Sequence, residues 1–570
     1  MPAAKVLRAA CLALGLALAT VSCSFLQGDA GRDGVRGGTL RVLSATPAMD
    51  LDTASVPELA RTYARTLYGY NLAGPRELAT VPVPDIADSP AQLSADRRTY
   101  TFTLRAGVRY APPVDREVTA ADFITAIQRL YNKEGPSYGQ PYADLITGAR
   151  RFATGKASRI SGLAAPDART LTITLDQPAP DFLSILTQPM FAPVPGEYAA
   201  NYAVGDNYSG HVVGSGPYTP TTYDPGRLIV LDRNPNWDPA IDPLRKAWVD
   251  QIRIRLGVEI ASIQRAIERE EADLSLSSHV PQARLTQLRA DPERSRRLSV
   301  NTTGNQLFLV LGTNRAAGAI ADVRVRQAVN YAIDKIAYRD AIAGRWAAAG
   351  QLASTIMAPG SLGYRPYDLY PTPGGRGDPA KARALLARAG YPDGLTLRFA
   401  TAGSGRFAAA NKVVRESLAR AGIDLKVKTY DGRGSDLWDK SLQLPAKRLE
   451  HQLGTNIWVQ LLPGDNARDT IPPRFDGRLL HPERNIDNFS EYNNPEVNRL
   501  IDRALAEPDP DRRANLWAGI DQRIMGDAPI VPLIWQDNSF YWSSPVHGWT
   551  YDPWASMPDL TAVWLDPPSA

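Results

Sequence analysis

The chain has 570 residues, of which 44% are hydrophobic and 22% are charged, a balance typical of globular proteins and enough length for two or more domains. Its 64 Lys and Arg residues nearly balance its 60 Asp and Glu residues, and no basic run stands out, which argues against nucleic-acid binding. Only two cysteines are present, Cys11 and Cys23. The long stretch that follows them therefore has no disulfide, catalytic thiol or cysteine metal site.

The N-terminal residues have the layout of a secretory signal peptide. Basic residues precede an apolar run over residues 9–19, and small residues follow directly before Cys23. This run is about half of the ~20 residues that span a bilayer, which makes a permanent transmembrane helix the weaker alternative. The residues before Cys23 resemble a bacterial lipobox, in which the thiol is acylated, although Thr20 stands where Leu is usual. Ordinary cleavage that leaves a free thiol is the other alternative.

We therefore predict a signal peptide over residues 1–22, lipid attachment at Cys23 and a tether over residues 23–37. The tether prediction rests on composition, because this segment is rich in Gly and charge and has almost nothing apolar to bury.

The following segments alternate between strand and helix patterns. Residues 38–45 contain the apolar run of a buried strand, and residues 97–104 alternate apolar and polar side chains as a half-exposed strand does. A helix is predicted after Thr119, which serves as N-cap, with Asp122 at the capping-box position. Each apolar helix face needs a sheet to cover it, which indicates an α/β protein.

The second half repeats this pattern. Asp378 and Pro379 mark a helix start that Gly390 ends. A strand over residues 395–401, a helix ending at Gly422 and a strand from Ile423 to Val427 then form a βαβ unit, so part of the sheet is predicted to be parallel. Near the end of the chain, Asn494 and Pro495 begin another amphipathic helix.

Catalytic motifs are missing from the sequence. There is no G-x-S-x-G, H-E-x-x-H, Walker loop or G-x-G-x-x-G. The five histidines never fall at metal-ligand spacing, and each is predicted to have a surface or structural role: His211, His279, His451, His481 and His547. A triad assembled from distant residues stays open. We predict no catalytic residue, no metal site and no cofactor.

Six sequence blocks, in order, carry a resemblance to a known family. They are "RRTYTFTLRAGVRY", "GSGPYTPTTYDPGRLIVLDRNPNW", "ADVRVRQAVNYAIDK", "DPAKARALLARAGYPDG", "NFSEYNNPEVNRLIDRAL" and "APIVPLIWQ". In this order the chain resembles, from about Gly38 to Trp549, the family 5 extracellular solute-binding proteins, which are peptide- and nickel-binding receptors of ABC importers.

The resemblance implies a fold: an α/β, two-lobed clamp like the periplasmic binding proteins, of the type II, large three-domain variety, with strands that cross between the lobes as a hinge. Residues 38–78, 215–298 and 532–570 would form lobe 1 (domain Ia). Residues 79–214 would form an inserted domain Ib, and residues 299–531 would form lobe 2.

The function implied is the capture of a peptide or peptide-like solute between the lobes and its delivery to a membrane permease. The implied partners are this solute and the permease and ATPase subunits of the importer. The protein itself would be a monomer without nucleic acid or cofactor, lipid-anchored to the outer face of the bacterial plasma membrane. Two alternatives stay open: a cell-surface sensor or adhesin that uses the same clamp, and a surface hydrolase.

The resemblance also implies ligand-binding residues. The loop after the first strand would supply Ser55 and Val56, and the other lobe would supply Trp458 with Gln460 and Leu461. A Trp at a strand end is more often part of a core, and the family match is what favours the cleft. Asn314 matches a family position ahead of a helix, and hydrogen bonding in a turn is the alternative account of it.

One departure from the family pattern concerns ligand charge. In peptide-binding members, the acid of a Trp-x-x-Asp motif pairs with the ligand's α-amine, and here that position is Leu461, with Leu462 in place of the aromatic residue that usually follows. We therefore predict weak binding of peptides with a free amine, because a buried ammonium without a partner is costly. Asp465 and Asp469 follow within the same segment, and either could take over the role if the loop is re-aimed.

Overall fold

The computed structural model describes residues 34–55, 57–73, 79–131, 140–202, 206–343, 350–403, 405–430, 442, 450–460, 462, 464–465, 467–481 and 487–567. The predicted signal peptide and Cys23 lie outside these residues.

Three sheets of four or more strands organise the described chain, beside three two-stranded ones. The first sheet has the order β11-β1-β10-β9-β8 (Leu274–Ser275, Thr39–Leu43, Gln251–Arg255, Leu228–Arg233, Tyr218–Asp224). The second sheet has the order β4-β5-β7-β6 (Gln92–Leu93, Thr99–Thr103, Thr170–Thr174, Leu163–Ala164). The third sheet has the order β13-β17-β12-β16-β14-β15 (Gln351–Leu352, Ile530–Tyr541, Leu298–Leu311, Leu453–Trp458, Leu395–Ala402, Ile423–Tyr430).

Helices cover these sheets and supply the apolar residues of the cores. The third sheet carries α11 (Val323–Ala332), α12 (Lys335–Ala343), α13 (Pro379–Arg388), α14 (Gly405–Arg420), α19 (Pro495–Ala506) and α20 (Pro510–Asp527). The other two sheets carry α2 (Ala120–Arg129), α5 (Phe182–Ile185), α8 (Ile260–Glu268) and α9 (Gln282–Ala290). Separate hydrophobic clusters form on the first, second and third sheets, so each sheet has a core of its own.

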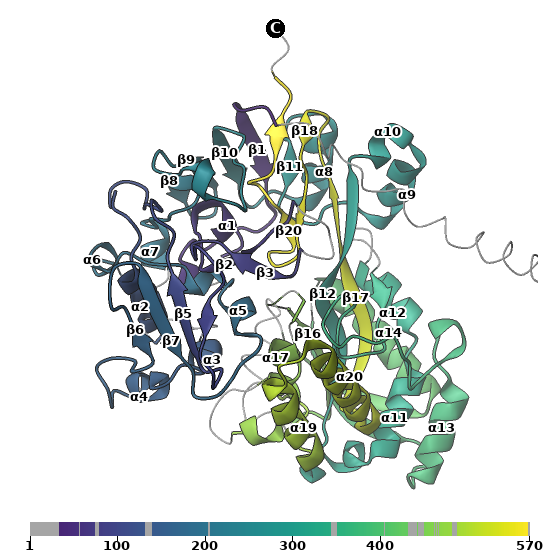
Figure 1. Ribbon diagram of the computed structural model, residues 1–570. Helices are drawn as coiled ribbons and strands as arrows, with labels where there is room; N and C mark the ends of the chain where they lie inside the picture. The colour runs from purple at the N-terminus through teal and green to yellow at the C-terminus, as the bar shows by residue number, and fades with distance from the viewer. Residues whose placement is uncertain are drawn as a thin grey trace, which may run out of the picture.

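Strands β12 and β17 connect the two lobes. They pair antiparallel along almost their whole length, from Leu298 opposite Tyr541 to Val310 opposite Ile530. Figure 1 shows them running together from the part that holds β1 and β11 into the part that holds β16 and α20. Their register shifts between Thr302 and Gln306, where the ladder is interrupted. The molecule is thus a two-lobed clamp whose lobes are joined by crossing strands.

Local predictions from the sequence agree with these elements. Helix α2 begins after Thr119, whose N–H donates to the Asp122 carboxylate at 2.8 Å as a capping box requires. The side chain of Asp378 accepts from the N–H of Lys381 at the start of α13. The predicted βαβ unit is present, since β14 and β15 pair in parallel on either side of α14.

One detail of that unit differs from the prediction. The alternation in β15 led us to expect Ile423, Leu425 and Val427 on one apolar face. Ile423 is fully buried, but Val427 is 38% exposed. The reason is position, because β15 is the edge strand of the third sheet and pairs with β14 alone.

A buried network of four charges joins Arg65 and Asp85 to Asp242 and Arg245, which lie between β9 and β10. Arg65 contacts Asp85 at 2.8 Å and Asp242 at 3.6 Å, and Arg245 contacts the same two carboxylates at 2.9 and 3.2 Å. All four side chains are almost inaccessible to solvent. Two cations and two anions cancel, which makes their burial tolerable.

Candidate ligand site between the lobes

The segment that follows β16 extends from lobe 2 into the opposite lobe. It leads to α17 (Ala467–Thr470) and α18 (Pro472–Phe475). Leu462 within it is fully buried, and it packs into the hydrophobic cluster of the second sheet, not into the cluster of its own lobe. The described part of this segment therefore forms the boundary between the lobes.

Polar contacts also cross this boundary. Arg468 donates two hydrogen bonds to the carboxylate of Asp181, at 2.5 and 2.9 Å. The Tyr142 hydroxyl donates to Asp469 at 2.8 Å, and burial together with this carboxylate holds the Tyr142 pKa well above its usual value. The two lobes are therefore joined through buried polar groups at this boundary.

Trp458 is the last residue of β16 and is half-buried beside this boundary. Its indole Nε1 is buried and has no hydrogen-bond partner among the described residues. Asn456 projects from the same face of the strand, because side chains two residues apart share a face. Its Oδ1 accepts from the N–H of Ile457, whereas its Nδ2 is buried and lacks a partner in the described chain.

Arg474 of α18 packs against the indole of Trp458. Its Cζ lies 4.4 Å from that ring centroid, 5.4 Å from the ring of Phe475 and 5.6 Å from the ring of Phe308, a cation–π arrangement. Only 3% of Arg474 is exposed. Burial lowers its pKa to about 9, against the opposing effect of three aspartates, the first of which is Asp469.

Comparisons with known proteins agree with this two-lobed fold. The sequence profile of the bacterial extracellular solute-binding proteins, family 5 middle region, matches residues 81–466. This chain belongs to family 5 of the extracellular solute-binding proteins. Heme-binding protein A of Haemophilus influenzae is 26% identical over 467 residues, which are 79% of this chain and 78% of that protein. Glutathione-binding protein GsiB of Escherichia coli O157:H7 is 24% identical over 541 residues, or 92% and 93% of the two chains.

Solved structures of similar fold include clavulanic acid biosynthesis oligopeptide binding protein 2. It superposes with a TM-score of 0.83 at 31% identity and covers 93% of this chain and 96% of its own. The murein tripeptide binding protein MppA of Escherichia coli shares the fold at 21% identity, with a TM-score of 0.69 and coverage of 93% and 98%.

In this family 5 protein, the first-lobe loop that we expected in the site is well packed. Ser55 ends the short η1 helix (Thr53–Ser55), is half-buried, and donates its N–H to the carbonyl of Asp52 at 2.9 Å. Val56 lies outside the described residues. No contact of Ser55 with Trp458 or its neighbours was found among the described residues, so its assignment to the ligand site stays a prediction.

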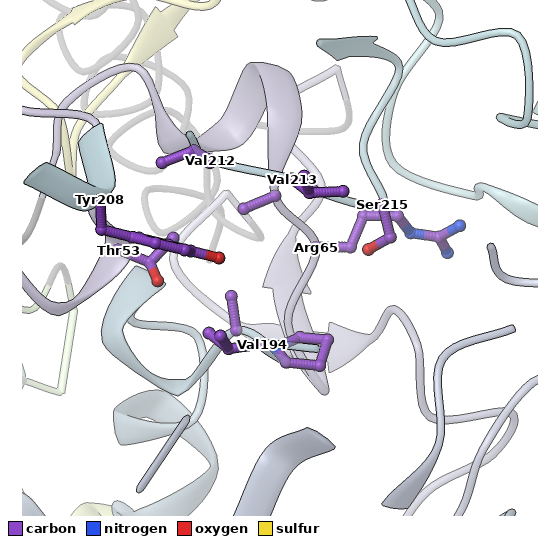
Figure 2. A pocket seen from close by; sticks show the side chains of 11 residues that line it. Thr53, Arg65, Val194, Tyr208, Val212, Val213 and Ser215 are labelled. Carbon is purple, nitrogen blue, oxygen red and sulfur yellow. The ribbon is translucent and has the colours of Figure 1, made fainter. Parts of the chain in front are cut away.

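A small cavity lies directly behind this loop. It encloses about 10 Å³, room for roughly one water molecule. Figure 2 shows Thr53 and Tyr208 on one side of it and Ser215 on the other, while the Arg65 guanidinium points away. The Ser215 hydroxyl is buried without a partner in the described chain, so it can bind such a water. The cavity is too small for a peptide.

Asn314 lies apart from Trp458. It caps the η5 helix (Arg315–Ala321), where its Oδ1 accepts from the N–H of Ala316 at 3.0 Å and its Nδ2 donates to Glu491 at 2.7 Å. A second small cavity borders Asn314 and the first residues of β16, whereas Trp458 ends that strand. These hydrogen bonds are those of a turn, the alternative that the sequence left open.

Gln460 links the segment after β16 to strand β12 by a hydrogen bond. Its N–H donates to the side chain of Asn305 in β12 at 3.1 Å, and its Nε2 donates to the carbonyl of Leu462 at 2.5 Å. Leu461 lies outside the described residues. Ligand contacts of Gln460 and Leu461 remain predictions.

The two acids that could replace the missing amine-binding aspartate both have protein partners. Asp465 accepts from Arg513 at 2.7 Å, and burial raises its pKa. Asp469 accepts from Tyr142 of the opposite lobe. Each carboxylate therefore already has one protein partner in this structure.

Sequence reasoning missed the most unusual residue of the site. Arg474 stands in "IPPRF", which carries no motif, and its position over Trp458 depends on how α18 folds back on β16.

Within the described chain, no three His, Cys, Asp or Glu side chains are grouped so that they could hold a metal ion. A search of the same residues found no helix with the length and apolar character needed to cross a bilayer.

Proposed function

We propose that this solute-binding protein is the receptor of an ABC importer and captures a peptide-like solute between its lobes. The observation that carries the proposal is the boundary around Trp458, where α17 meets Asp181 and Tyr142 of the other lobe through buried polar contacts. The named relatives support it, because they are described as binding glutathione, heme or oligopeptides. We assign it a binding role without turnover.

The mechanism follows from the two lobes and their hinge. A solute that touches both lobes is bound fully only in the closed form, so it shifts the population toward closure. A shift from 1:99 to 99:1 closed requires about 5.5 kcal/mol of differential affinity. The permease would then recognise the closed clamp, and the ATP would be hydrolysed by a separate subunit.

The domain limits in this proposal are those expected from the family. Lobe 1 would comprise residues 38–78, 215–298 and 532–570, and the strands of the first sheet fall within these ranges. Domain Ib would comprise residues 79–214, which include the second sheet, and lobe 2 residues 299–531. A monomer tethered by lipid at Cys23 beside its permease completes the proposal.

The ligand class is tested by calorimetry with paired peptides. We expect peptides with a free amine to bind weakly and their N-acetylated forms to bind more tightly, because Leu461 offers no carboxylate. A lost charge-assisted hydrogen bond is worth about 1.5–3 kcal/mol, or roughly ten to more than a hundredfold in affinity. Equal sub-micromolar binding of both forms would remove the argument from Leu461. Tight binding that acetylation abolishes would show that another acid has taken over.

A further inference from the structure

Three buried N–H groups without partners in the described chain lie on one face of β16. They are Nδ2 of Asn456, Nε1 of Trp458 and Nη1 of Arg474, and none has a hydrogen-bond partner among the residues that the structure describes. Asn456 and Trp458 share the strand face. The Arg474 guanidinium lies over the rings of Trp458 and Phe308. Phe308 is the residue of β12 that pairs with Asn456. Buried donors are satisfied in the great majority of cases, so three together require an explanation.

The orientations of two of these groups, Asn456 and Arg474, are fixed by their other hydrogen bonds. Asn456 uses its Oδ1 to accept from the Ile457 N–H, which directs Nδ2 away from that bond. Arg474 uses its Nε to donate to the carbonyl of Thr470 at 2.7 Å, which leaves the Nη side of the guanidinium for another acceptor. These two unpaired donors are therefore held in place, as the groups of a binding site are.

Arg326 shows how a structural arginine is accommodated in the same lobe. It is also buried, yet its guanidinium donates to the carbonyls of Ile320, Ala321 and Asp527 through four hydrogen bonds between 2.7 and 3.0 Å. Arg474 has a single such bond and no carboxylate within ion-pair distance in the described chain. Burial of a cation with so few partners is costly unless a further anion joins it.

The nearest protein acids are engaged elsewhere. Asp469 accepts from Tyr142, and Asp521 accepts from the N–H groups of Ile356 and Met357. Asp487 is the third acid near Arg474, and all three carboxylates act on it only through longer-range attraction. An anion that pairs directly with Arg474 must therefore come from outside the described chain.

We propose that Asn456, Trp458 and Arg474 form a subsite for a carboxylate of the ligand. The inference rests on the proposed receptor function and specifies which charge the receptor selects. A planar guanidinium donates to a carboxylate through two parallel N–H groups, and the surrounding aromatic rings exclude competing water. The subsite is close to the lobe boundary, because Thr470, the acceptor for Arg474, directly follows Asp469, which contacts the opposite lobe.

A buried hydrogen-bond acceptor on β12, opposite Trp458, suggests that the subsite binds the C-terminal residue of a peptide. Gln306 stands opposite Trp458 in the register of β12 and β16. Its Nε2 donates to the carbonyl of Thr355 at 2.7 Å, and its Oε1 is buried without a partner in the described residues. A C-terminal residue of a peptide offers both a carboxylate for the donors and a neutral N–H for this oxygen. The preferred ligand is thus an acid with a blocked or absent amine.

The test compares two libraries of N-acetylated di- to pentapeptides, one with free C-terminal carboxylates and one with C-terminal amides. We expect the wild-type protein to bind the carboxylate library at least tenfold more tightly in calorimetry. Arg474→Met should remove this preference, Asn456→Ala should reduce it, and Arg474→Lys should retain part of it. The matched control Arg326→Met should keep the preference.

Thermal unfolding without ligand gives a second readout that does not depend on the ligand's identity. Arg474→Met should leave the Tm unchanged or raise it, because it removes a buried and under-paired charge, whereas Arg326→Met should lower it. A lower Tm for Arg474→Met would mark Arg474 as structural and overturn the proposal.

The binding outcomes separate this inference from the receptor function. Wild-type protein that binds both libraries equally leaves the receptor in place and overturns the carboxylate subsite. Wild-type protein that binds neither library contradicts the peptide-receptor function, and the subsite proposal falls with it.

Discussion

Arg468 of α17 pairs with Asp181 through two parallel hydrogen bonds, although 287 positions separate the two residues. Both side chains are largely withdrawn from solvent, at 12% and 7% exposure. The Coulomb attraction between such charges is stronger than at a surface, because water screens it less. This ion pair therefore favours the closed clamp, in addition to whatever a ligand contributes.

Removing this ion pair should open the ligand-free protein. Both Arg468→Met and the double variant with Asp181→Leu are expected to increase the radius of gyration in small-angle X-ray scattering, since they weaken the closed state alone. Arg478→Met is the matched control, because Arg478 also contacts two carboxylates, Asp476 and Asp502, but within one lobe. An unchanged radius in both Arg468 variants would show that the pair does not hold the clamp closed.

The four-charge network around Asp85 should matter for folding and not for closure. Asp85→Asn leaves Arg65 and Arg245 with a single carboxylate, Asp242, and should lower the free energy of unfolding by about 3–5 kcal/mol in urea titrations. Asp96→Asn, which removes an exposed pair with Arg98, should change the free energy of unfolding far less, because water screens that pair. Equal effects of the two substitutions would contradict the role assigned to the network.

The burial of His279 beside β17 should make the stability of the protein depend on pH. His279 is fully buried, and its backbone N–H donates to the carbonyl of Ser539 in β17. Burial lowers the pKa of its imidazole to about 4 from 6.5. Between pH 4 and 6.5 the unfolded chain binds a proton that the folded protein does not, so stability falls as the pH is lowered through this range. At pH 5 the loss from this group is about 2 kcal/mol relative to pH 7.

The measurement compares wild type with His279→Gln, which cannot titrate. Urea unfolding at pH 7 and pH 5 should show that wild type loses about 2 kcal/mol more than the variant between these pH values. The comparison uses the difference between pH values, so any constant cost of the substitution cancels. Parallel losses would mean that the imidazole is protonated without penalty.

Local elements of this fold could be predicted from sequence because their signals are short-range. The capping box of Thr119 and Asp122 and the cap at Asp378 depend on residues within one helical turn. The βαβ unit follows from spacing and periodicity. The exposure of Val427 could not be predicted in this way, because it depends on which strand ends the third sheet, a property of the whole chain's topology.

The site was harder to predict than the fold. Trp458 came from a family motif, and the structure places it beside the lobe boundary, although its contact with ligand is still a prediction. Arg474 and Asp181 carry no motif, and their roles arise from contacts that bring together residues far apart in the chain or on separate elements. The family pattern indicated what is missing at Leu461, but only the folded structure reveals the under-paired cation nearby.

The last prediction concerns attachment to the membrane through Cys23, which lies outside the described residues. If its thiol carries lipid, Cys23→Ser should move the protein from the membrane fraction into the medium, or leave it held only by an uncleaved signal peptide. One acyl chain binds a membrane marginally, whereas two give stable anchoring, so loss of the acylated cysteine should shift the distribution strongly. Cys11→Ser is the matched control, because Cys11 is removed with the predicted signal peptide and its substitution should change nothing. Fractionation with mass spectrometry of the N-terminal peptide measures both. Wild-type protein that is already released and free of lipid would show that cleavage follows the ordinary secretory route.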